Sequence, residues 1–147
     1  MKKQTVKEQI EAIMAAAEKL IPAYVADPKD AFSEGNVAIC IIDEEGNVYG
    51  RLYGKDKIPT RRTFQLAWTK ASQVWITGMK TVEFERKIFN GELNEKDFGI
   101  QPPDFIGWPG GQPVILKDGT HLSIGFSGFR GSSDLEIVQK AIRELGI

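Results

Sequence analysis

The sequence predicts a mixed α+β domain built on an antiparallel sheet. Two pairs of short apolar segments are each joined by turn residues, at 45–47 and at 118–119, which is the pattern of a β-hairpin. Amphipathic helical patterns precede, separate and follow the two hairpins. This order favours helices around an antiparallel sheet over a parallel, doubly wound sheet. The length of 147 residues fits a single domain that spans residues 1–147.

The N-terminal segment has the pattern of an amphipathic helix. Thr5 and Glu8 stand in the spacing of a capping box, in which each side chain binds a free backbone N–H group of the first turn. Apolar residues then recur at helical spacing and form one face. Pro22 lacks an N–H group, so we expect a kink or an end there, although Tyr24 and Val25 continue the pattern.

The first hairpin predicts a strand that is buried on both of its faces. Residues 37–42 are consecutive apolar residues, rich in β-branched side chains and too few for a helix of normal length. The returning strand at 48–53 carries Gly50 at a bulge position. Cys40 lies in the middle of the apolar run without a cationic neighbour, so we interpret it as a packing residue and not as a nucleophile.

The strongest amphipathic pattern of the chain lies at 60–78. Thr60 is expected to cap this helix, whose apolar residues keep three-and-four spacing. Its small residues Ala67 and Ala71 suit close packing on a sheet. A shorter helix follows it, and residues 94–111 are so rich in Pro and Gly that we expect a long surface loop. Loops of this length in small domains are often functional.

The C-terminal part combines the second hairpin with a helix. Glycines at 125–131 follow the spacing Gly-x-x-Gly-x-x-Gly, which matches neither a dinucleotide fingerprint nor a P-loop. Ser133 and Glu136 are expected to form another capping box. Free N–H groups at this helix start attract anions such as a carboxylate, whereas Ser132, Ser133 and Asp134 also fit an ordinary helix cap.

Composition excludes several classes of function. Nineteen Lys and Arg residues against 20 Asp and Glu residues, mixed along the chain, disfavour a nucleic-acid or membrane-surface partner. No apolar run is long enough to span a membrane, and the N-terminus lacks the apolar core of a signal peptide. The single cysteine fits a reducing compartment. We therefore expect a soluble cytoplasmic protein.

Candidate ligand-binding residues are few. His121, the only histidine, suits an axial ligand of haem iron or a general base, and a plain surface or core histidine is the competing interpretation. Arg61, Arg62 and Lys70 lie on or next to the central helix, where Arg62 and Lys70 stand about 80° apart around the axis. They either flank a groove and pair with carboxylates or propionates, or form a solvated helix face.

Aromatic residues in the long loop are a second signal of binding. Phe98, Phe105 and Trp108 lie there, and their burial requires a partner surface, a ligand or the domain's own core. With one histidine and no nucleophile-elbow motif, no Ser-His-Asp arrangement is indicated. The residues therefore favour a binding protein over an enzyme.

Four segments, taken in order, carry a family resemblance. The segments 36–54, 67–75, 109–119 and 123–134 resemble the signature segments of the GlcG/HbpS-like family, the haem-degrading domain also found at the C-terminus of PduO-type corrinoid adenosyltransferases. The resemblance covers about residues 5–145. It implies a profilin-like α/β/α three-layer domain with a five-stranded antiparallel sheet, assembled into homo-oligomers. Positions matching the family's motifs look chiefly architectural, and they are Lys70, Ala71, Gly110, Gly111, Pro113, Gly125, Ser127, Gly128 and Asp134.

The resemblance also sets the functional hypotheses. The leading one is a small ligand-binding protein that holds haem or a related tetrapyrrole and, as in some members, degrades it. His121 would ligate the iron, Arg61, Arg62 or Lys70 would pair with propionates, and the remaining contacts would come from two loop aromatics, Phe105 and Trp108. The alternative is an accessory or interaction module in diol, glycolate or corrinoid metabolism. A third, enzymatic hypothesis acts on a small carboxylate at the final helix start, without an identified base.

Overall fold

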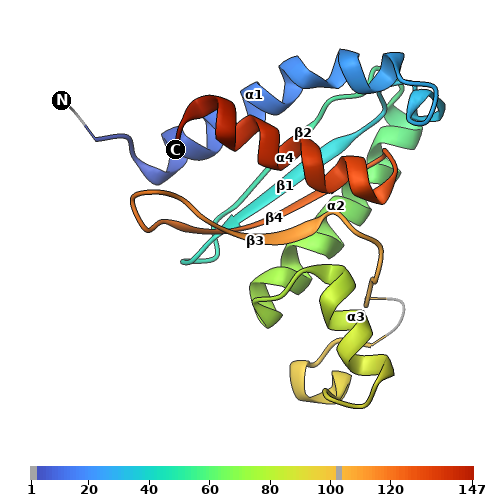
Figure 1. Ribbon diagram of the computed structural model, residues 1–147, viewed down its shortest axis with the longest axis vertical. Helices are drawn as coiled ribbons and strands as arrows, with labels where there is room; N and C mark the ends of the chain where they lie inside the picture. The colour runs from blue at the N-terminus through green and yellow to red at the C-terminus, as the bar shows by residue number, and fades with distance from the viewer. Residues whose placement is uncertain (1–2, 102–103) are drawn as a thin grey trace.

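The computed structural model describes residues 3–101 and 104–147 of the chain. Within these residues it forms an antiparallel sheet of four strands in the order β2–β1–β4–β3 (Figure 1). The strands are β1 (Ala38–Asp43), β2 (Val48–Leu52), β3 (Gly111–Ile115) and β4 (His121–Ser127). The expected α+β class and both hairpins are confirmed. The fifth strand is not found in the described ranges, because their other long segments are helical or rich in Pro and Gly.

Helices lie on both faces of this sheet. The helices α1 (Val6–Ala26) and α4 (Gly131–Leu145) pack against each other and cover one face, whereas α2 (Lys57–Thr77) covers the other (Figure 1). The larger core lies between the sheet and the α1–α4 pair, where Ile39, Ile41 and Phe126 are fully buried. None of the helices in the described ranges combines the length and the apolar character that crossing a bilayer requires.

The central strand β1 is buried throughout, as its apolar run predicts. All six of its residues are buried, with Ile39 and Ile41 facing the α1–α4 side and Cys40 and Ile42 facing α2. Burial raises the pKa of the Cys40 thiol to about 12, so the thiol stays protonated at neutral pH. This agrees with a packing role for Cys40.

The helix α2 lies unusually close to β4 because β4 has a glycine beneath it. A Cβ atom on Gly125 would stand 2.2 Å from the carbonyl oxygen of Ala67 and 2.7 Å from the backbone nitrogen of Ala71. The two alanines present the smallest side chains available at this contact. The expected close packing of this helix on a sheet is therefore confirmed, and Gly125 is the residue that permits it.

The helix α1 begins as expected and ends later than expected. The Thr5 hydroxyl accepts a hydrogen bond of 3.1 Å from the Glu8 N–H, which confirms the cap. The helix continues through Pro22 as far as Ala26. Tyr24 in this last turn is buried and stacks on Phe129, with ring centroids 5.3 Å apart. This packing explains why the helix does not end at the proline.

Two other expected caps are wrong. The helix α2 begins at Lys57, where the Asp56 carboxylate accepts from the Ile58 N–H, and Thr60 lies inside the first turn. The helix α4 begins at Gly131, so Ser133 is helical and its hydroxyl donates to Asp30 over 2.6 Å instead of capping. The Thr60 hydroxyl donates to the Asp56 carbonyl oxygen over 2.6 Å, and the Ser133 hydroxyl is taken by the Asp30 carboxylate, so neither is available as a cap.

The described residues between α2 and β3 form a projection away from the sheet (Figure 1). It contains α3 (Thr81–Phe89), and the expected long loop includes a short 3₁₀ helix, η2 (Glu95–Phe98). Phe84 of α3 is fully buried and meets Phe98 and Phe105 edge to face, with ring centroids 5.2 and 5.4 Å apart. Two of the three loop aromatics are therefore covered by the domain's own side chains. Trp108 is 63% exposed.

Candidate functional site

A groove with His121 at its rim lies at one end of the face covered by α2. It has a volume of about 590 Å³. We call it the His121 groove, and it is lined by Ile42, Asp43, Glu44, Val74, Trp75, Gly78, Pro113, Val114, Ile115, His121, Leu122 and Ser123. Side chains alternate along β4, and Leu122 and Ile124 face the α1–α4 core, so His121 and Ser123 face the α2 side.

The walls of the His121 groove are mainly apolar, and its polar rim is acidic. Trp75 is 48% exposed and donates its indole N–H to the Asp43 carbonyl oxygen over 3.1 Å, which fixes the ring as a wall. Ile115 on the edge strand is 65% exposed. The Asp43 carboxylate is satisfied by Asn47, which donates its backbone and side-chain N–H groups over 2.9 Å each. The groove therefore offers one exposed imidazole and apolar walls.

His121 also lines a second hollow, of about 540 Å³, next to the groove. Lys7 and Tyr49 contribute to this hollow, together with the acidic turn residues Glu44 and Glu45. His121 thus stands between two concave surfaces. Lys7 is the cationic side chain that shares a concave surface with it.

A buried ion pair lies at the opposite end of the same face. Lys70 of α2 donates from Nζ to the Phe126 carbonyl oxygen over 2.9 Å and to Asp134 Oδ2 over 3.3 Å. Asp134 Oδ1 accepts a hydrogen bond of 3.0 Å from the Phe129 N–H. The two charged side chains are only 2% and 3% exposed. Lys70 therefore faces inward toward β4 and α4, and not the solvent.

Burial dominates the acid–base chemistry of this pair. It raises the pKa of Asp134 to about 7, against the lowering effects of Lys70 and the Phe129 N–H group. It lowers the pKa of Lys70, against the raising effect of Asp134. Both shifts disfavour the charged forms. Burial therefore works against both charges, whereas the attraction and the hydrogen bond between Lys70 and Asp134 work in favour of them.

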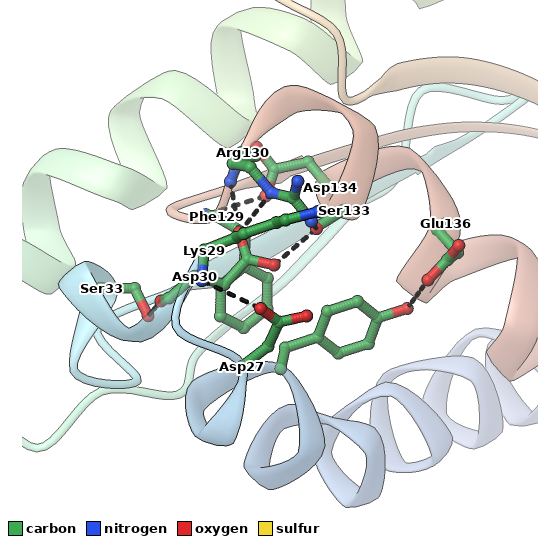
Figure 2. A network of polar contacts seen from close by, with 10 residues as sticks. Asp27, Lys29, Asp30, Ser33, Phe129, Arg130, Ser133, Asp134 and Glu136 are labelled. Carbon is green, nitrogen blue, oxygen red and sulfur yellow. Dashed lines mark hydrogen bonds and ion pairs between the residues drawn. The ribbon is translucent and has the colours of Figure 1, made fainter.

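A second carboxylate, that of Asp30, forms hydrogen bonds with residues at the start of α4 (Figure 2). Asp30 is fully buried, and it accepts from the Arg130 N–H over 2.9 Å and from the Ser133 hydroxyl over 2.6 Å. Burial opposes ionisation of Asp30, but the hydrogen bonds from Ser133 and Arg130 outweigh it and hold its pKa below the ordinary value. This network connects the segment after α1 to the corner between β4 and α4.

A smaller pocket adjoins the Lys70–Asp134 pair. It has a volume of about 270 Å³, and we call it the Lys70 pocket. Its lining consists of Phe32, Thr63, Leu66, Lys70, Trp108, Pro109, Ser127, Gly128, Phe129, Gly131 and Asp134. Gly110 passes directly over the amine, since a Cβ atom there would stand 2.6 Å from Lys70 Nζ. The absence of a side chain at Gly110 therefore leaves the room that the amine occupies.

The structure does not bring the six predicted binding residues together. His121 lies in the His121 groove, whereas Lys70 and Trp108 line the Lys70 pocket. Arg61 and Arg62 are exposed near the start of α2, about 20 Å along the helix from Trp75 at a rise of ~1.5 Å per residue.

The sixth predicted residue, Phe105, packs against Phe84 in the projection. Lys70 is engaged by Asp134, so in this conformation it does not offer its charge to a propionate at the surface. Each of these placements follows from tertiary contacts that no short motif records.

Sequence reasoning missed Asp30 and the pairing of Lys70 with Asp134. A usable signal existed for Lys70, which falls among Ala67, Ala71 and Val74 on the buried stripe of its helix. A lysine in that stripe requires a buried partner. For Asp30 no comparable signal exists, because its partners lie about 100 residues further along the chain.

Comparisons with known proteins agree on a family. The family model described as "Haem degrading protein HbpS-like" matches residues 13–143. Among curated protein sequences, none matches this chain significantly. Solved structures do match over almost the whole chain.

Three of these structures illustrate the likeness. The crystal structure of a double mutant of Streptomyces reticuli HbpS is 20% identical with a TM-score of 0.59, and the match covers 99% of this chain and 92% of that one. Klebsiella pneumoniae protein ORFY is 19% identical with a TM-score of 0.68, over 97% and 94% of the chains. The complex of PduOC with haem is 18% identical with a TM-score of 0.70, also over 97% and 94%.

At these identities the structural likeness concerns the fold. The family match rests on the sequence, and it extends over both hairpins, α2 and the Lys70–Asp134 pair. The expected family resemblance is confirmed by this match, and the chain belongs to the HbpS-like family.

Proposed function

We propose that this protein binds haem or a related tetrapyrrole in the His121 groove. The observation that carries the proposal is the position of the only histidine, exposed at the rim of an apolar groove of about 590 Å³. Imidazole is a common protein ligand of haem iron. Apolar walls with few polar groups are typical of sites that bury a flat cofactor. The similar PduOC structure was solved as a complex with haem, which supports the same ligand class.

The groove fits the macrocycle better than it fits the propionates. Val74, Trp75 and Ile115 offer apolar contact, whereas Asp43 and Glu44 at the rim would repel carboxylates. We therefore place the propionates toward solvent and toward Lys7, which shares the adjoining hollow with His121. Arg61 and Arg62 would reach the same ligand only from a neighbouring copy of the chain.

Bound haem would itself supply any redox chemistry at its iron, including that of haem degradation. The chain's own part would be to hold the macrocycle by Trp75 and its neighbours and to hold the metal by the His121 imidazole. Degradation would then depend on how much of the haem the groove leaves open to solvent, and the rim residues Ile115 and His121 are exposed.

A titration with ferric haem, followed in the Soret band, tests this proposal. We expect a saturable shifted band for the wild-type protein and a band of different position and lower affinity for His121→Ala. Ser123→Phe, which fills the groove from the same strand face, is expected to abolish saturable binding. Lys117→Ala is the matched control, because Lys117 lies in the same hairpin outside the groove.

Two results would contradict the proposal. Spectra that do not saturate in the wild-type protein would exclude specific binding of haem. A saturable band that is identical in the wild type, His121→Ala and Ser123→Phe would exclude this groove as the site. If Lys117→Ala weakens haem binding as much as His121→Ala does, the loss reflects a non-specific effect of the hairpin charge.

We further propose that copies of the chain associate through the seam between β2 and α2. Val48 and Leu52 are about half exposed there, and Trp68 is 45% exposed. The Phe64 ring lies over Gly50, so Trp68, one turn further along α2, faces the same side of the helix. A two-fold arrangement would cover this apolar strip with its own copy.

Sedimentation velocity tests the association. We expect the wild-type protein to sediment as an oligomer and Trp68→Glu to shift toward the monomer. Lys140→Glu on the far side of the sheet serves as the charge control. A monomeric wild-type protein at micromolar concentration would refute this interface.

A further inference from the structure

The Lys70 pocket combines a buried amine with an adjacent carboxyl group and apolar walls. Its walls include Phe32, Leu66 and Trp108, and the two aromatic side chains at its mouth, Phe32 and Trp108, are 67% and 63% exposed. The pocket shares no lining residue with the His121 groove. It therefore needs an explanation of its own, independent of haem.

We propose that Lys70 forms a Schiff base with a small aldehyde or ketone that enters the Lys70 pocket. An amine becomes a nucleophile when it loses its proton, and a desolvated lysine beside a proton acceptor is the arrangement that proteins use for this purpose. Lys70 is 1% exposed, and its Nζ lies 3.3 Å from Asp134 Oδ2. The required acceptor is therefore already in place.

The geometry around Nζ leaves one position for the carbonyl carbon. An ammonium group has three N–H bonds, and two of them point to the Phe126 carbonyl oxygen and to Asp134. Lys70, Asp134 and Ser127 all line the Lys70 pocket, so a carbonyl compound would approach Nζ from the pocket. A volume of about 270 Å³ lies just below the ~300–1,000 Å³ of ordinary ligand pockets, so the carbonyl compound must be small.

The reaction balances with the groups present. The Lys70 ammonium transfers one proton to Asp134, and the nitrogen lone pair then forms a C–N bond to the carbonyl carbon while the C=O π bond opens. A second proton moves from nitrogen to the former carbonyl oxygen, which gives a carbinolamine. Asp134 returns its proton to the hydroxyl group, and the C–O bond breaks to release water. The product is an iminium ion opposite an ionised Asp134, so the charge of the pair is unchanged.

A purely structural ion pair is the competing interpretation, and it predicts a different reactivity. A buried pair that only ties α2 to α4 would protect Lys70 from any reagent. A carbonyl site would make Lys70 more reactive than exposed lysines, because each unit by which the pKa of a lysine falls raises its neutral fraction at pH 7 about tenfold. A Lys70 that reacts more slowly than exposed lysines would therefore indicate a structural ion pair, and one that reacts faster would indicate a carbonyl site.

The experiment uses the full-length protein with butanal and sodium cyanoborohydride at pH 7, which reduces any Schiff base to a stable alkyl-lysine. After brief reaction and digestion, mass spectrometry quantifies alkylation at each lysine. We expect Lys70 to react severalfold faster than the exposed references Lys57 and Lys117. Alkylation of Lys70 no faster than that of the references would overturn the proposal.

A pair of matched variants separates the pocket from the fold. Thr63 lines the Lys70 pocket, whereas Thr69 lies on the same helix outside it, and each hydroxyl donates to a backbone carbonyl within α2. Thr63→Phe is expected to lower Lys70 alkylation at least about tenfold, while Thr69→Phe keeps the wild-type rate. Unchanged alkylation in Thr63→Phe would refute entry through this pocket.

The role of Asp134 is tested by Asp134→Asn, with circular dichroism as a check of folding. We expect slower alkylation of Lys70, with unchanged rates at Lys57 and Lys117, because asparagine cannot supply the proton that releases water from the carbinolamine, and this loss outweighs the lower pKa that Lys70 has without the carboxylate. If this variant fails to fold, the comparison of the two threonine variants still decides the proposal. An equal or higher rate in folded Asp134→Asn would refute the proton transfer through Asp134.

Discussion

Replacing Gly125 by alanine tests the contact that sets the position of α2. The new Cβ atom would stand 2.2 Å from the Ala67 carbonyl oxygen, whereas ordinary contact begins at 3.4 Å. The helix must therefore retreat by about 1 Å, and a gap of 0.5–1 Å forfeits roughly a quarter to a half of the dispersion energy of the facing atoms. Overpacking of this kind costs ~1–3 kcal/mol. Both clashing atoms are backbone atoms, which cannot rotate away, so we expect the upper end, about 3 kcal/mol.

A smaller effect opposes this loss. Alanine restricts the unfolded chain more than glycine does, which stabilises the folded state by ~0.4–1 kcal/mol. The net expectation is a decrease of about 2 kcal/mol in the free energy of unfolding. Urea denaturation followed by tryptophan fluorescence measures it, and at ~1–3 kcal/mol per molar urea the midpoint should fall by about 1 M.

Two controls make the reasoning refutable. Gly50→Ala places its Cβ atom 2.5 Å from the Phe64 ring, a side chain that can move, so we expect a loss below about 1 kcal/mol. Ser123→Ala, on the same face of β4 as Gly125, should change stability by less than ~0.5 kcal/mol. If Gly125→Ala costs no more than these two variants, the close approach of α2 is not what the structure describes.

Three further predictions concern stability. Lys70→Met should cost about 3–5 kcal/mol in urea unfolding, because it leaves Asp134 buried without its partner, and the double variant Lys70→Met/Asp134→Leu should recover most of the loss. Asp30→Asn should remove a loss of stability that the wild-type protein shows in acid. The folded-state pKa of Asp30 lies below its unfolded value of 3.8, so the contribution of Asp30 to stability is present above that pH and is lost as the pH falls through the folded-state value. Urea midpoints measured from pH 5 downward would record the difference. Thr5→Ala should cost about 1 kcal/mol in thermal unfolding through loss of the α1 cap, and an unchanged midpoint would contradict it.

Local patterns predicted the helices and strands of this fold well, because the residue pattern of each element reflects which of its faces is buried. The apolar run of β1 predicts a strand buried on both faces, and it is one. Both hairpins follow from their turn residues, since the required backbone angles restrict which residues occur there; Gly46 and Gly119 both have positive φ. The same locality explains the confirmed cap at Thr5.

Hydrogen bonds between residues distant in sequence limited the prediction of the helix caps and of the candidate site. Ser133 looks like a cap until Asp30, distant in sequence, takes its hydroxyl hydrogen bond. Lys70 looks like a solvated residue next to Arg61 and Arg62 until Asp134 approaches from α4. Such pairings join residues from distant parts of the chain, so a single sequence carries no periodic signal for them.

The contact at Gly125 also divides the α2 face into its two candidate sites. Because β4 and α2 run in opposite directions, Ser123 meets the C-terminal part of the helix in the His121 groove, and Ser127 meets its N-terminal part in the Lys70 pocket. Between them the two backbones touch at the glycine, without room for a ligand. A ligand at either end must therefore act on the other through movement of α2 as a whole. If butanal at Lys70 leaves haem affinity unchanged, α2 stays fixed and the sites are independent, whereas a change in affinity would identify α2 as the element that couples them.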